Sequence, residues 1–67
     1  MNRKEKQIME IETRIAQQPL TDVSRAILIS IDLYLEADDA RERNKYWTAI
    51  RILSISMFPE VFRRGRK

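Results

Sequence analysis

The sequence predicts an all-α protein, with an N-terminal helix over about residues 2–18 and an antiparallel helical hairpin over about 22–37 and 40–58. Three observations predict this fold class. Apolar residues recur at helical spacing, good N-cap residues precede both helices of the hairpin, and the single glycine lies far from any hairpin turn. A chain of 67 residues has room for one small domain, which we place at residues 1–62.

Isoleucines mark one face of the first predicted helix. Ile8, Ile11 and Ile15 follow one another at spacings of three and four residues, which places them on one narrow stripe. Because so thin a stripe is typical of a coiled-coil seam, we assign these residues to an oligomer or partner interface. Pro19 ends the helix, since proline has no backbone N–H and disfavours the helical conformation of the residue before it.

The two helices of the hairpin contain similar apolar blocks, residues 28–34 and 52–58. Thr21 precedes the first helix and Asp39 precedes the second, and both residue types are good N-caps. Only a few residues around Asp38 separate the helices, and short connections join antiparallel neighbours. We therefore expect the two blocks to pack against each other.

A strand interpretation of the two blocks stays open at this level. Ile29, Ile31 and Leu33 alternate with polar residues, and β-branched residues are frequent. Helix is favoured because the caps fit it, because residues 36–45 are good helix formers, and because no Gly or Asn-Gly turn signal separates the blocks.

Each helix of the hairpin carries a second apolar sector that one hairpin cannot bury. The sectors consist of Ile29 and Leu33 in the first helix and of Ile52 and Ile55 in the second. Exposed apolar patches of this kind mark interfaces, and a short chain without cysteine commonly relies on oligomerisation for stability. We therefore expect a homodimer that forms a helical bundle.

Charge is divided unevenly along the chain, whose net charge is +3. Residues 19–39 carry one basic and five acidic side chains, whereas residues 40–67 carry eight basic and two acidic ones. One interpretation pairs the acidic and basic parts, within the chain or across a dimer. The other is a basic surface for nucleic acid or an acidic protein. The candidate contacts are basic residues of the C-terminal third: Arg41, Arg43, Lys45, Arg63, Arg64, Arg66 and Lys67.

Residues 63–67 form a basic tail that we expect to be disordered. Its Arg64-Gly65-Arg66 triplet is similar to the centre of an AT-hook, a motif that enters the minor groove of DNA, although the flanking prolines of such a hook are missing. Tyr46 and Trp47 lie beside several cations, where an aromatic ring can stack on the bases of a single strand. Their helical spacing favours the core instead.

The residue types present argue against catalysis. The chain has no His and no Cys. Gly65 is its only glycine, and a glycine-rich phosphate loop needs more than one. Asp32 and Glu36 lie one turn apart, but two carboxylates are too few for a calcium site. We therefore expect no metal, no cofactor and no small-molecule substrate.

These observations predict a non-catalytic regulatory protein that acts as a homodimer by binding a larger protein partner, as an adaptor, inhibitor or anti-factor. The alternative is a small nucleic-acid-binding regulator that uses the basic C-terminal third and tail, together with Arg3, Lys4 and Lys6 at the N-terminal end. The longest apolar stretch has about ten residues, whereas a membrane span needs about 20, and the N-terminus has no signal-peptide pattern. We expect a cytoplasmic protein without membrane contact.

Overall fold

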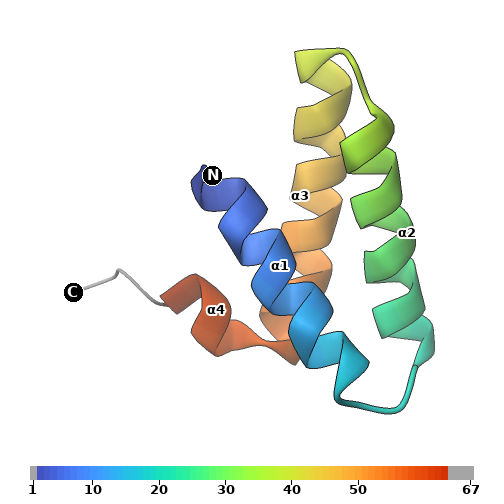
Figure 1. Ribbon diagram of the computed structural model, residues 1–67, viewed down its shortest axis with the longest axis vertical. Coiled ribbons are helices and arrows are strands. Elements are labelled where there is room, and N and C mark those ends of the chain that lie inside the picture. The colour runs from blue at the N-terminus through green and yellow to red at the C-terminus, as the bar shows by residue number, and fades with distance from the viewer. Residues whose placement is uncertain (1, 64–67) are drawn as a thin grey trace.

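Figure 1 shows a computed structural model of the protein, which describes residues 2–63. These residues form four helices and no strand, which confirms the all-α prediction and excludes the strand interpretation of the two apolar blocks. The helices are α1 (Arg3–Ala16), α2 (Asp22–Glu36), α3 (Ala40–Met57) and α4 (Pro59–Arg63). The helices α1, α2 and α3 each end one or two residues before the C-terminal end predicted for them from the sequence. Within the described part of the chain, no helix is long and apolar enough to span a bilayer.

Capping residues determine where α2 and α3 begin. Thr21 Oγ1 accepts a hydrogen bond from the Ser24 amide at 3.1 Å, and Ser24 Oγ accepts one from the Thr21 amide at 2.7 Å, which makes a capping box. The Asp39 carboxylate accepts a hydrogen bond from the Arg41 amide at 3.2 Å. Both predicted N-caps are confirmed.

The hairpin of α2 and α3 forms the larger part of the fold. Residues 37–39 connect the two helices, which contact each other more extensively than any other pair of elements. Their buried apolar residues are Ile27, Ile31 and Tyr34 on α2 and Ile50 on α3. In Figure 1 the hairpin lies behind α1, and α4 lies beside α1 near the C-terminal end of α3.

α1 covers the hairpin and belongs to the core of the same chain. Ile8, Ile11 and Ile15 are 3%, 0% and 4% exposed and pack into one cluster with the apolar residues of the hairpin. These three residues therefore pack within their own chain and do not form the oligomer or partner interface that the sequence predicted for them. A narrow stripe is sufficient here because α1 meets the hairpin along only one side.

Residues after α3 form a helix that the sequence did not predict. Pro59 ends α3 as expected, and it also occupies the first position of α4, where a missing N–H costs nothing. Phe58 and Val61 are both 2% exposed and complete the core. Arg63 is the last residue of α4 and not the first residue of a tail, while residues 64–67 of the predicted tail lie outside the described residues.

Candidate functional site

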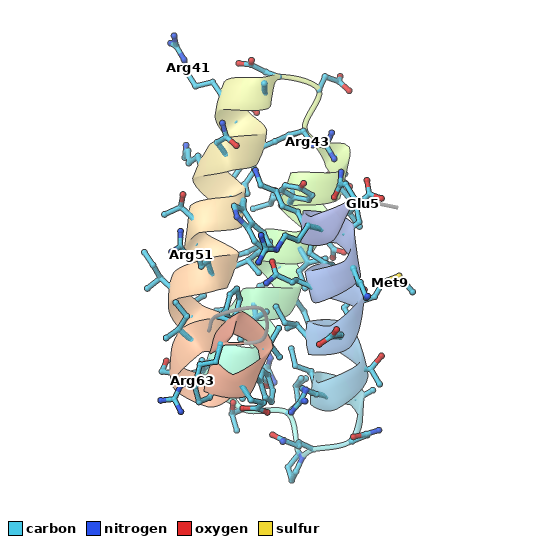
Figure 2. The ribbon with its side chains drawn as sticks, turned by 90° about the vertical axis from the view of Figure 1, so that its left-hand side faces the viewer. Glu5, Met9, Arg41, Arg43, Arg51 and Arg63 are labelled. Carbon is cyan, nitrogen blue, oxygen red and sulfur yellow. The ribbon has the colours of Figure 1, made fainter. Side chains whose placement is uncertain are left out.

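A hollow of about 500 Å³ lies where the N-terminal part of α1, the middle and C-terminal part of α3, and α4 meet. Figure 2 looks toward this side of the molecule, with α3 on the left, α1 on the right and α4 in front. None of the described residues in its lining is acidic. The lining includes four cations and two aromatic rings: Arg3, Lys4, Arg51, Arg63, Trp47 and Phe62.

A second hollow, of about 380 Å³, lies next to the first, toward the N-terminal end of α3. The two share Arg3 and Lys4, and the second adds Arg43 and Tyr34. We call the two hollows together the basic groove. Among the described residues, five cations and no carboxylate line the basic groove.

Neutral side chains hold two of these cations in place. Lys4 Nζ donates a hydrogen bond to Asn44 Oδ1 at 3.2 Å and lies 5.8 Å from the centre of the Trp47 ring. The Arg43 guanidinium carbon lies 4.7 Å from the centre of the Tyr34 ring, and the buried Nε of Arg43 has no hydrogen-bond partner. Contacts with aromatic rings orient a cation without neutralising it. The groove therefore keeps its positive charge for an anionic ligand.

Trp47 connects the groove to the core. Its ring centre lies 6.2 Å from that of Tyr34 and 6.4 Å from that of Phe62, and both pairs are tilted, as aromatic pairs prefer. The indole is half-buried and at the same time lines the first hollow. Trp47 thus packs against the core, as expected from the sequence, and also forms part of the groove surface.

Two acidic side chains near the groove are directed elsewhere. Glu60 of α4 forms an ion pair with Arg14 of α1 and joins these two helices. Glu5 lies on the side of α1 away from α3 (Figure 2), where it accepts a hydrogen bond from the Asn2 side chain. The charge that faces the groove is therefore of one sign.

A set of exposed aliphatic side chains on the two helices of the hairpin, pointing away from the core, is the second candidate site. Ile29 and Leu33 of α2 are 55% and 39% exposed, and Ile52 of α3 is 64% exposed. Residues two positions apart lie about 200° apart around a helix, so Ile29 points away from the buried Ile27, and Ile52 away from the buried Ile50. We call Ile29, Leu33 and Ile52 the outer face.

The structure separates residues that the sequence grouped together. Ile55 was predicted to share a sector with Ile52. It lies about 60° from Ile52 around α3, on the side toward α1 and α4, and lines the basic groove. Of the predicted basic contacts, Arg43 and Arg63 line the groove, whereas Arg41, at the N-terminal end of α3 (Figure 2), does not line it. Lys45 is exposed, and residues 64–67 are outside the described chain.

One cation of the groove, Arg51, was absent from the nucleic-acid contacts predicted from the sequence, whereas Arg3 and Lys4 were predicted among the basic ends of the chain. A signal for Arg51 exists, because Arg43, Trp47 and Arg51 follow each other at intervals of four residues and so share one face of α3. No local pattern places Arg3 and Lys4, since their position depends on how α1 crosses the hairpin.

Among the described residues, no group of three or more Asp, Glu, His or Cys side chains is arranged to hold a metal ion. No family model matches the chain, and neither a curated protein nor a solved structure was found to be similar to it. The basic groove and the outer face are therefore the two features from which we infer a function.

Proposed function

We propose that this protein is a non-catalytic interaction module whose working form is a homodimer joined through the outer face. The observation that carries the proposal is the exposure of three large aliphatic side chains, on both helices of the hairpin, that point away from a core already covered by α1 and α4. Their exposed fractions add up to about one and a half side chains, and burying a whole Leu or Ile side chain contributes about 1.5–3 kcal/mol. Two copies together gain about 5–9 kcal/mol, from which the cost of association is deducted.

Charges near the outer face fit a second copy of the same chain. Asp32 and Glu36 of α2 and Arg41 and Lys45 of α3 are exposed, and the structure shows no ion pair among these four. At 1.5 Å per residue, Asp32 and Lys45 both lie about 10 Å along their helices from the connection at Asp38. A twofold axis parallel to the hairpin lays α2 of each copy on α3 of the other. In this arrangement, the acidic side chains of α2 in each copy face the basic side chains of α3 in the other copy.

Binding is the activity that we assign to this dimer. The chain has no His and no Cys, so the common pairs of nucleophile and base cannot form. In the proposal, the dimer acts on a larger protein as an adaptor, an inhibitor or an anti-factor. Nucleic-acid binding is the second candidate, and the basic groove is the observation that favours it.

Sedimentation over a range of protein concentrations tests the homodimer. The double variant Ile29→Gln with Ile52→Gln removes exposed area equal to about 1.2 side chains per chain, or about 4–7 kcal/mol per dimer. We expect a dissociation constant raised more than a hundredfold and an unchanged circular dichroism spectrum. Met9→Gln is the matched control, because Met9 is 51% exposed but lies on α1 (Figure 2). A wild-type chain that is monomeric at about 1 mM contradicts the proposal.

A charge exchange tests the twofold arrangement. Asp32→Lys and Lys45→Asp each place like charges opposite one another across the dimer, so each is expected to weaken it. The combination of both restores opposite charges and is expected to recover most of the affinity. If the combined variant is as weak as the weaker single variant, these two residues do not meet and the arrangement is wrong.

A further inference from the structure

We propose that the basic groove binds single-stranded nucleic acid, with phosphates along Arg3, Arg43, Arg51 and Arg63 and a base against Trp47. The groove lies on the side of α3 that faces α1 and α4, and the outer face consists of other residues, none of which lines the groove. The proposal is therefore independent of the homodimer, and either can fail without the other.

The length of the groove suits several nucleotides. Arg43, Trp47, Arg51 and Ile55 share one face of α3, and the twelve steps between the first and the last span about 18 Å. Stacked nucleotides advance about 3.4 Å each along a strand, so about five of them match this length. The first hollow, of about 500 Å³, is within the range of small-ligand pockets and has room for a base with its sugar.

The electrostatics of the groove favour a polyanion. Its five cations come from α1, α3 and α4, and no described carboxylate interrupts them. The Arg43 Nε is buried and without a hydrogen-bond partner, so a phosphate oxygen that reaches it relieves an unsatisfied donor. The N-terminal end of α1 also lies at the second hollow, through Asn2 and Arg3, and the helix dipole favours an anion there.

The aromatic lining distinguishes a single strand from other polyanions. A duplex keeps its bases stacked on each other, and an acidic peptide offers carboxylates without flat rings. Only a strand with accessible bases uses both the cations and the indole of Trp47. The Lys4 ammonium lies 5.8 Å from this ring, and its flexible side chain is able to turn toward a phosphate when a base takes its place.

Trp47 is the only tryptophan of the chain, so its fluorescence reports on the groove alone. The test is a titration of the full chain with a labelled oligo(dT) of about 20 nucleotides, followed by anisotropy and by Trp47 emission. We expect binding and quenching at about 50 mM salt. Five phosphate contacts on a single strand, from the four arginines and Lys4, give a logarithmic salt slope of about −3.5, so affinity falls about a hundredfold at four times the salt concentration.

Two double variants with the same change in net charge separate groove binding from general attraction. Arg51→Glu with Arg63→Glu removes two contacts, so the salt slope falls to about −2 and the loss over the same salt range to about twentyfold. Lys6→Glu with Arg25→Glu is the matched control, because these residues are exposed and do not line the groove. We expect the control to keep the wild-type slope. Circular dichroism of each variant verifies the fold.

Comparison ligands complete the test. Heparin carries charge without bases, and we expect it to bind without quenching Trp47. The proposal is overturned if oligo(dT) does not bind at about 50 mM salt, if it binds without changing the Trp47 emission, or if the control pair loses as much salt dependence as the groove pair. A duplex or a polyglutamate that binds as tightly as oligo(dT) also overturns it, since the aromatic lining then has no role in the choice of ligand.

Discussion

Two buried serines of the hairpin provide a test in which the same substitution has opposite effects. Ser24 and Ser54 are 1% and 0% exposed. Ser24 Oγ belongs to the capping box of α2 and donates to the Thr21 carbonyl oxygen at 2.9 Å, besides accepting the Thr21 amide. Ser54 Oγ, in the middle of the core, has no hydrogen-bond partner. Alanine at each position therefore removes a bonded hydroxyl in one variant and an unbonded one in the other.

Whether each substitution raises or lowers the free energy of unfolding depends on whether the hydroxyl that it removes is hydrogen-bonded. A buried polar group without a partner costs about 1–3 kcal/mol, because it has lost its hydrogen bonds to water. Ser54→Ala removes this cost and adds helix propensity, so we expect the free energy of unfolding to rise by about 1 kcal/mol. Ser24→Ala breaks the capping box and leaves the Thr21 amide without its partner, so we expect a fall of about 1 kcal/mol.

Thermal unfolding followed by circular dichroism measures both effects. In a domain of this size, 1 kcal/mol shifts Tm by about 4–8 °C, so the two variants are expected to differ by about 8–16 °C. All samples need the same protein concentration, because association raises the apparent stability. A lower Tm for Ser54→Ala than for the wild type would contradict this prediction, since it would mean that the Ser54 hydroxyl is hydrogen-bonded in the native state.

Two further predictions concern the packing of α1. Ile11→Val is expected to lower the free energy of unfolding by about 0.5–1.5 kcal/mol in urea, because Ile11 is fully buried. Leu35→Val also deletes one methylene, but Leu35 is 56% exposed and outside both candidate sites, so its effect stays within about 0.5 kcal/mol. An equal effect at both positions would contradict the burial of α1. Glu60→Gln removes the charge that pairs with Arg14, and because both side chains are partly exposed we expect a loss below about 1 kcal/mol that disappears at high salt.

The parts of the fold that local signals determine were predictable from the sequence. The hairpin follows from Thr21, Asp39 and the short connection between the helices, all of which act within a few residues. The packing of α1 was not predictable in this way, because an isoleucine stripe at helical spacing fits a partner helix in the same chain as well as one in another. α4 was missed because Pro59 ends one helix and begins another, and only the first role was considered.

The basic groove was predictable only in part, for a related reason. Its strip along α3 has a periodic signal in Arg43, Trp47 and Arg51, which a helical wheel detects. The cations of α1 join that strip through tertiary packing, over the 40 residues that separate Lys4 from Asn44. Residues that meet at such a separation leave no trace in local periodicity.

The contact between α1 and α4 also bears on the order in which the molecule folds and opens. The Arg14–Glu60 pair closes a loop of 46 residues, whereas α2 and α3 meet across a short connection. Because a longer loop costs more entropy to close, the hairpin is expected to form first, and α1 and α4 to dock last and detach first. The basic groove exists only while both outer helices are docked, so a ligand held there would stabilise the region of the molecule that opens most readily.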